Sequence, residues 1–243
     1  MLLLVQVASS LLFTPYLIRS LGQAEYGLYS LALSLTGYFL LLDAGVGNAM
    51  VRYLAKFRVA EDLDQQQRFL GLSILFYAGM GVVILLLGAL LQGNLPFIFG
   101  RGLTGAEVEQ VSAMLTITLV NAAITLVASA FDRAIIAYER FVFSRCMSIA
   151  QLVLRVFVVA GLLYAGYRAV AVVTVSLVLT CVFGAVSVAY VLLRLKLRPL
   201  FSGMKLSFIR EVLSYSGFIF IQMVAMQLNL MSNQVLLGMM ASA

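Results

Sequence analysis

Long apolar segments constrain the fold of this chain more than any other feature. A bilayer core of about 30 Å requires roughly 20 apolar residues in a helix. The segments that meet this requirement are approximately 2–18, 26–47, 69–91, 110–131, 146–165, 169–193 and 212–237. Because backbone groups in lipid need hydrogen-bond partners within the protein, such segments cross as helices. The sequence therefore predicts an all-α integral membrane protein with about seven transmembrane helices.

Composition supports this class and excludes several functions. Only 11% of the 243 residues are charged, whereas about a quarter are charged in soluble domains. The absence of His removes His metal ligands and His-assisted nucleophiles. Neither a phosphate-binding loop motif nor a pair of carboxylates within a span is present. We therefore expect no cofactor, no enzymatic activity and no nucleic-acid partner, and we interpret Cys146 and Cys181 as small buried apolar residues.

The basic residues predict the orientation. The connectors 48–68, 132–145 and 194–211 hold 12 of the 16 Lys and Arg residues, whereas the opposite connectors hold Arg19, Arg101 and Arg168. Cytoplasmic loops of membrane proteins carry the excess of Lys and Arg. The N-terminus is therefore predicted to be cytoplasmic.

Arg155 is the most informative polar residue within a span. It lies roughly 14 Å from either end of segment 146–165 at the helix rise of 1.5 Å per residue, too far for its charge to reach the interface fully. Gln151 and Ser148 share its helix face. An Arg facing lipid would be costly, so this side chain is expected to face the bundle interior. It either binds an anionic substrate group or locks helices through a salt bridge.

Other polar residues are weaker candidates. Asp43 lies near the end of segment 26–47, where it either pairs with a basic group such as Arg52 or is hydrated. Arg133 either lines a cytoplasmic entrance or is solvated, and Asn229 belongs to a polar stripe of segment 212–237. Segments 69–91 and 169–193 carry few polar groups and are expected to face lipid.

Two N-terminal motifs resemble a known family. They are Pro15-Tyr-Leu-Ile-Arg-Ser-Leu-Gly-Gln-Ala-Glu-Tyr-Gly-Leu-Tyr29 and Asp43-Ala-Gly-Val-Gly-Asn-Ala-Met-Val-Arg-Tyr53. Both are similar to the N-terminal signature of polysaccharide (O-antigen type) flippases in the multidrug/oligosaccharidyl-lipid/polysaccharide exporter superfamily. The resemblance implies twelve to fourteen helices in two lobes around a central cavity. Residues 1–211 would form an N-terminal six-helix lobe and residues 212–243 the first helix of a second lobe, so we expect an incomplete chain.

The resemblance also implies a function. Cationic cavity residues of such flippases hold the pyrophosphate of a polyprenyl-linked sugar, a role that Arg155 and Arg19 could take here, with Arg52 and Arg133 at the cytoplasmic mouth. Gln151, Asp43 and Asn229 complete the candidate substrate-binding residues. The implied setting is the bacterial inner membrane and lipopolysaccharide or related surface-polysaccharide synthesis. Expected partners are a lipid-linked oligosaccharide, membrane lipids, a polysaccharide polymerase and other assembly proteins. The alternatives are a cation-coupled multidrug-type exporter, an integral-membrane enzyme of lipid-linked sugar metabolism, and a purely structural membrane subunit.

Overall fold

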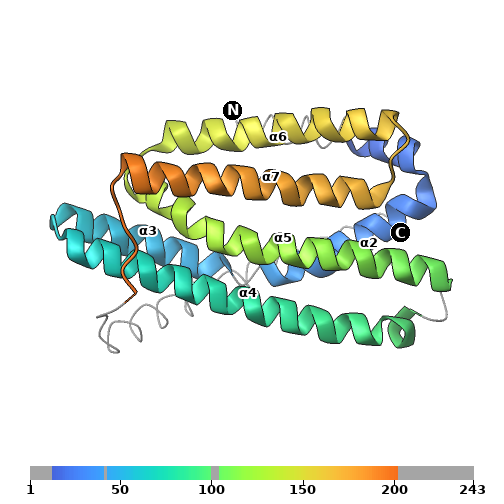
Figure 1. The fold of residues 1–243 in the computed structure, drawn as a ribbon, viewed down its shortest axis with the longest axis horizontal. Helices are drawn as coiled ribbons and strands as arrows, with labels where there is room; N and C mark the ends of the chain where they lie inside the picture. The colour runs from blue at the N-terminus through green and yellow to red at the C-terminus, as the bar shows by residue number, and fades with distance from the viewer. Residues whose placement is uncertain (1–12, 41–42, 100–103, 202–243) are drawn as a thin grey trace, which may run out of the picture.

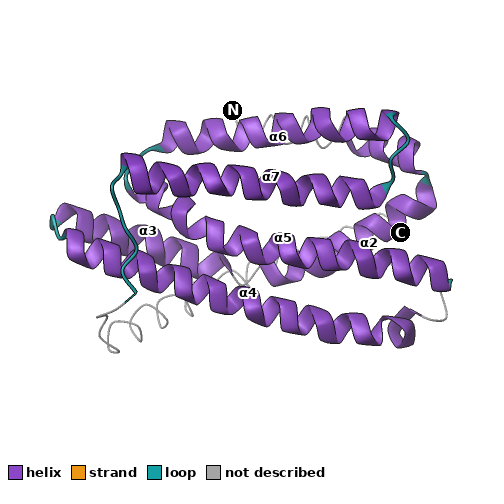
Figure 2. Cartoon of the chain, viewed as in Figure 1, coloured by secondary structure: helices purple, strands orange, loops and turns teal. Residues whose placement is uncertain are grey.

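The computed structural model describes residues 13–40, 43–99 and 104–201, and this part of the chain is a bundle of helices (Figure 1). Helices and short connectors account for all of the described residues, with no strand among them (Figure 2). Residues 13–21 are helical. The later elements are α2 (Gln23–Leu40), α3 (Asp43–Val59), α4 (Leu63–Phe99), α5 (Gly105–Ala137), α6 (Phe141–Tyr164), α7 (Ala169–Ala189) and the π-helical turn η1 (Tyr190–Arg194).

Within the described residues, four helices are long and apolar enough to cross a membrane. They are Leu63–Leu95, Gly105–Ala137, Phe141–Tyr164 and Ala169–Arg194. These match the predicted segments 69–91, 110–131, 146–165 and 169–193, and the break near Gly166 is confirmed. Segment 212–237 lies outside the described residues, and of segment 2–18 only residues 13–18 are described. The protein is therefore an integral membrane α protein, with four of the predicted spans confirmed.

The predicted span over 26–47 stays a prediction. The structure describes α2 to Leu40 and α3 from Asp43, and residues 41–42 between them lie outside the described residues. Most of the predicted connector 48–68 is consequently helical, because α3 continues to Val59.

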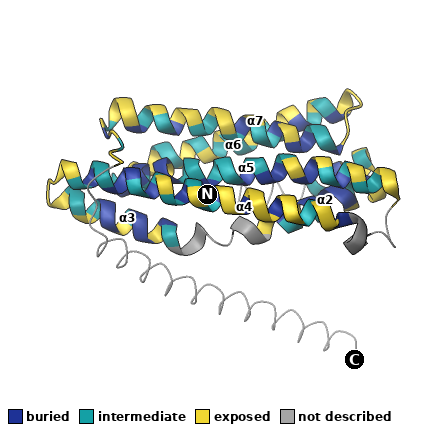
Figure 3. Cartoon of the chain, turned by 60° about the horizontal axis from the view of Figure 1, so that its bottom comes forward, coloured by how far each residue is buried: buried dark blue, intermediate teal, exposed yellow. Residues whose placement is uncertain are grey.

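Helix α5 is the centre of the bundle. It packs against α2, α3, α4 and α7, and its buried side chains include Met114, Leu115 and Leu126. The prediction that segments 69–91 and 169–193 face lipid stays a prediction, and the structure shows that only one side of each helix is open to the surroundings. α4 and α7 each turn an exposed apolar stripe outward (Figure 3) and pack their other side on α5. The stripes are Val82, Leu86 and Leu90 on α4 and Val178, Val182 and Val186 on α7.

The prediction that both cysteines are buried was also wrong. Cys146 on α6 and Cys181 on α7 are both exposed. Lipid tails are as apolar as a Leu side chain, so an apolar thiol in a membrane helix is compatible with either the core or the lipid-facing surface. Hydrophobicity alone therefore does not determine whether a cysteine lies on the buried or the exposed face of its helix.

One end of the bundle carries most of the basic residues and is held by contacts between α3, α4 and α5. Arg58 of α3 donates to the carbonyl oxygen of Ala137 over 3.2 Å, and its guanidinium lies 5.0 Å from the ring centroid of Tyr138. The Tyr138 hydroxyl donates to Gln66, whose amide donates to the Phe57 carbonyl over 3.3 Å. Burial raises the pKa of the Tyr138 hydroxyl, which keeps it a donor at neutral pH. The short turns 60–62 and 138–140 are fixed together by this network.

At the same end, the segment after η1 crosses α4 (Figure 1). The backbone N–H of Leu200 donates to the carbonyl of Gln67 over 3.0 Å. A Cβ at Gly71 would lie 2.2 Å from the Leu200 carbonyl oxygen, so only glycine permits this approach. The segment that follows η1 is therefore tied to the start of α4.

At the opposite end, Glu25 connects three helices. Its carboxylate accepts from the backbone N–H of Ala169 over 2.9 Å, from the amide of Gln110 over 3.1 Å and from Arg168 over 3.4 Å. Arg168, which precedes α7, makes no side-chain capping hydrogen bond. Glu25 therefore caps α7 from α2, where a negative charge also suits the positive end of the helix dipole.

Candidate functional site

A polar stripe along α6 holds two of the predicted substrate-binding residues, Gln151 and Arg155. Ser144, Ser148, Gln151 and Arg155 follow one another at intervals of four, three and four residues, which places them on one helix face. The first three line a cavity between α5, α6 and α7. Arg155 is the next residue along this face, about 6 Å beyond Gln151 at 1.5 Å per residue.

Arg155 is turned into the bundle. Its Nη2 donates to the hydroxyl of Tyr29 on α2 over 3.4 Å, and Tyr29 is only 5% exposed. The Nε of Arg155 is buried and has no hydrogen-bond partner in the part of the chain that the structure describes. The ion pairs of that part do not include Arg155 either. The guanidinium thus retains donor capacity for an anion.

The helix at 13–21 closes this region beside α6. The hydroxyl of Tyr16 donates to the carbonyl oxygen of Ala160, 3.2 Å away and little more than one turn beyond Arg155. Two tyrosines from the first motif therefore contact the same stretch of α6.

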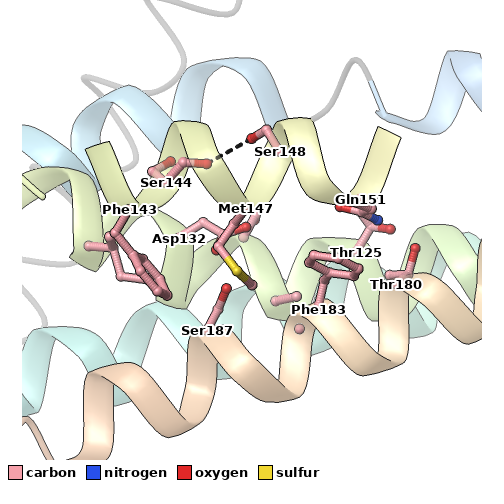
Figure 4. Close-up of a pocket in the computed structure, with 14 residues that line it drawn as sticks. Thr125, Asp132, Phe143, Ser144, Met147, Ser148, Gln151, Thr180, Phe183 and Ser187 are labelled. Carbon is pink, nitrogen blue, oxygen red and sulfur yellow. Dashed lines mark hydrogen bonds between the residues drawn. The ribbon is translucent and has the colours of Figure 1, made fainter. Parts of the chain in front are cut away.

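The cavity beside the stripe has a volume of about 140 Å³ and is lined by a mixture of polar and apolar side chains (Figure 4). Asp132 of α5 contributes its only carboxylate among the described residues, and the Ser187 hydroxyl of α7 faces it. The other polar lining residues are Thr125, Ser129, Ser144, Ser148, Gln151 and Thr180, and the aromatic ones are Phe143 and Phe183.

Arg133 packs against the second motif. A Cβ at Gly47 of α3 would lie 2.6 Å from the Nε of Arg133, so the absence of a side chain at Gly47 provides the space for this guanidinium. The two residues are 86 positions apart in the sequence, and this contact joins α3 to α5. The arrangement places Arg133 on a different side of α5 from the cavity lined by Asp132.

The remaining predicted residues are not gathered around Arg155. Arg19 is exposed on the helix at 13–21, and Arg52 is exposed on α3. Asp43 begins α3, but its side chain is outside the described residues, as is all of Asn229. Among the described residues, Tyr29 accepts a hydrogen bond from Arg155, and Gln151 shares its helix face.

Sequence reasoning did not assign roles to Asp132 and Tyr29. A signal for Asp132 was present, because Thr125, Ser129 and Asp132 recur at intervals of four and three residues, and Thr180 and Ser187 are seven apart. These spacings place each set on one helix face. For Tyr29 the sequence offers only its position at the end of the first motif.

Solved structures share this fold. They include a MOP superfamily transporter from Pyrococcus furiosus whose title describes a binding pocket of reverse polarity, with 14% identity and a TM-score of 0.74 over 95% of this chain and 51% of that one. A multidrug resistance MATE family transporter in an outward-facing conformation is 16% identical, with a TM-score of 0.74 and the same coverage. MATE in complex with MaD3S is 14% identical, with a TM-score of 0.78 over 93% of this chain and 52% of that one. The chain therefore spans about half the length of these transporters.

The family is established by sequence. No curated protein matches the chain. The model of the family described as "Polysaccharide biosynthesis protein" matches residues 1–243, which is the whole sequence. The chain therefore belongs to this family, and it is a multi-pass membrane protein.

Proposed function

We propose that the full-length protein carries a polyprenyl-diphosphate-linked oligosaccharide across the bacterial inner membrane for cell-surface polysaccharide synthesis. The observation that carries this proposal is Arg155, a cation turned into the bundle whose Nε has no partner among the described residues. The family match supports a polysaccharide-related substrate.

The chemistry of Arg155 suits a diphosphate. Its guanidinium presents a planar fork of donors that matches phosphate oxygens. A charge in a transmembrane helix is costly unless it is paired or lies in a water-filled cavity, and the described residues supply only the Tyr29 hydroxyl. A diphosphate group would compensate this charge, while the polyprenyl tail remained in the bilayer.

The proposed transport uses alternating access between two lobes. Residues 1–211 would form the first lobe and residues 212–243 the first helix of the second. The substrate would enter from the cytoplasmic leaflet and leave on the far side after the lobes rock. The short basic connectors after α3, α5 and α7 lie at one end of the bundle (Figure 1), which favours a cytoplasmic N-terminus under the positive-inside rule.

The test replaces Arg155 in the full-length transporter. Purified protein is reconstituted in proteoliposomes with a polyprenyl-diphosphate oligosaccharide, and translocation is followed by access of an external glycosidase. We expect Arg155→Ala to slow translocation about 10- to 100-fold, because a hydrogen bond to a charged group contributes roughly 1.5–3 kcal/mol. Arg155→Lys should fall between Ala and the original protein, because it keeps the charge and loses the fork.

The matched control is Arg145→Ala, which removes an exposed Arg from the start of the same helix. It should translocate normally. Full activity of both Arg155 variants would refute the proposal. Arg155 instead has a structural role that holds helices together if Arg155→Ala lowers thermal stability and an Asp or Glu introduced nearby restores that stability.

A second candidate is a cation-coupled multidrug-type exporter, which the Asp132 carboxylate in the cavity favours. The two functions differ in their cargo. Uptake of tetraphenylphosphonium by the same proteoliposomes, abolished by Asp132→Asn and unaffected by Arg155→Ala, would favour the exporter.

A further inference from the structure

An apolar groove lies between α6 and α7, near the turn that joins these helices. Its volume is about 670 Å³, within the range of pockets that hold small organic ligands. Of the described residues along the groove, Arg168 alone is charged, and the Thr174 hydroxyl donates to the Val170 carbonyl of its own helix over 2.8 Å. Arg155 is not among those described lining residues. The groove is therefore separate from the proposed substrate site.

The groove begins at the level of the membrane interface. One candidate span ends at Tyr164 and the next begins at Ala169, so Arg168 lies in the turn between two spans. Tyr164 and Tyr167 in the same stretch are both exposed. Tyr is enriched at membrane interfaces, where its apolar ring and its polar hydroxyl both find a suitable environment. This end of the groove therefore lies at the depth of the lipid headgroups.

The length of the groove corresponds to one leaflet. Along α7 its described lining runs from Val170 to Leu179, which is about 14 Å at a rise of 1.5 Å per residue. The hydrocarbon core of both leaflets together is about 30 Å thick, so a single leaflet contributes about 15 Å. An apolar groove that starts at the headgroups and runs one leaflet deep has the length of one acyl chain.

Arg168 supplies a positive charge at the mouth of the groove. Its side chain is 81% exposed, and its Nη1 lies 3.4 Å from the carboxylate of Glu25, whose side chain is 10% exposed. The same carboxylate also accepts from Ala169 and Gln110. Among the described residues, no hydrogen-bond or ion-pair partner other than Glu25 contacts the Arg168 guanidinium. The outer side of this guanidinium can therefore donate to an anion while Nη1 stays on Glu25.

We infer that the groove binds one acyl chain of an anionic glycerophospholipid, with the phosphate of that lipid on the Arg168 guanidinium. The lipid comes from the leaflet beside the turn between α6 and α7. A soluble phosphate would gain only the contact with Arg168, whereas an uncharged lipid would gain only the apolar groove. An anionic phospholipid gains both. This binding requires no transported cargo, so it is independent of the proposed function.

The test measures lipid binding by the purified full-length protein in detergent, without any lipid-linked sugar. Phosphatidylglycerol and phosphatidylcholine with identical acyl chains are titrated, and the bound lipid is counted by native mass spectrometry. We expect a saturable site that prefers phosphatidylglycerol about fivefold, the usual effect of one basic residue near an anionic lipid. Glycerol 3-phosphate, which has the phosphate and no acyl chain, should not displace the lipid.

Two variants separate the charge from the groove. Arg168→Ala should abolish the preference for phosphatidylglycerol, because both lipids then gain only the groove. Thr174→Phe places a ring in the groove at an exposed position and should weaken binding of both lipids about tenfold. The matched controls are Arg145→Ala, an exposed Arg of α6, and Val182→Phe, an exposed apolar position of α7 outside the described lining. Both controls should bind lipid like the original protein.

Three results would overturn the inference. The first is an unchanged preference for phosphatidylglycerol in Arg168→Ala, and the second is binding of both lipids by Thr174→Phe equal to that of the original protein. The third is the absence of saturable lipid binding by the original protein, which would mean that another part of the full-length chain covers the groove. Because no readout involves translocation, a failure of the proposed function would leave this inference standing.

Discussion

Glu25 should be among the more costly positions to change, although it lies at the end of the bundle. Its carboxylate accepts the N–H of Ala169, which is fully buried, together with the amide of Gln110 and the guanidinium of Arg168. Glu25 itself is 8% exposed. Glu25→Ala would leave the first N–H of α7 buried without an acceptor.

The magnitude follows from these three contacts. An unsatisfied buried N–H costs about 1–3 kcal/mol, and the lost bond from the partly buried Gln110 adds about 0.5–1 kcal/mol. The pair with Arg168 adds little, because Arg168 is 81% exposed and surface ion pairs contribute about 0–1 kcal/mol. We expect Glu25→Ala to destabilise the protein by about 2–4 kcal/mol. Glu25→Gln, whose amide oxygen can still accept from Ala169, should cost about 1 kcal/mol, and Arg168→Ala at most about 0.5 kcal/mol.

The assay is reversible unfolding of the full-length protein in mixed micelles, with Glu109→Gln as the control for removing an exposed carboxylate. The predicted order is Glu25→Ala, then Glu25→Gln, then Arg168→Ala. If Arg168→Ala costs as much as Glu25→Ala, the ion pair rather than the helix cap holds this junction. A cost below about 0.5 kcal/mol for Glu25→Ala would refute the capping argument altogether.

Two further predictions concern helix contacts. Gly71→Ala should destabilise the protein by about 1–3 kcal/mol in the same assay, because its Cβ would meet the Leu200 carbonyl. Gly79→Ala, which meets nothing within 4 Å, should be neutral or slightly stabilising, and equal costs for the two variants would contradict the close approach. Thr36 donates to Thr118 over 2.8 Å between buried positions of α2 and α5, so a double-mutant cycle with Thr36→Val and Thr118→Val should give a coupling of about 0.5–1.5 kcal/mol. Additive costs would show that this hydrogen bond does not contribute to stability.

The spans of α4 to α7 could be predicted because length and apolarity decide what crosses a bilayer. The residues at which these helices end could not be predicted from apolarity, and this changed the interpretation of Asp132. The predicted segment ended at residue 131, whereas α5 continues to Ala137. Asp132 therefore lies within α5 rather than in a connector, and its side chain is exposed at the border of the cavity. Apolar runs locate the hydrocarbon core, but a helix continues beyond it for as long as hydrogen bonds and packing support it.

The inward orientation predicted for Arg155 followed from energy alone, since an Arg facing lipid is costly. Its contact with Tyr29 could not be predicted, because the two residues are 126 positions apart and no local pattern relates them. The contact between Arg133 and Gly47 could not be predicted for the same reason. Periodicity identifies the face of a helix, whereas the partner across that face depends on how all the helices pack.

The two N-terminal motifs carried the family resemblance, and the structure indicates how so short a signature relates to the rest of the described bundle. Three of their residues contact three different later helices. Glu25 caps α7, Tyr29 accepts from Arg155 of α6, and Gly47 makes room for Arg133 of α5. Each contact constrains where the later helix lies relative to the first two. The later helices need few sequence constraints of their own beyond apolarity, because the motifs already specify the positions they pack against.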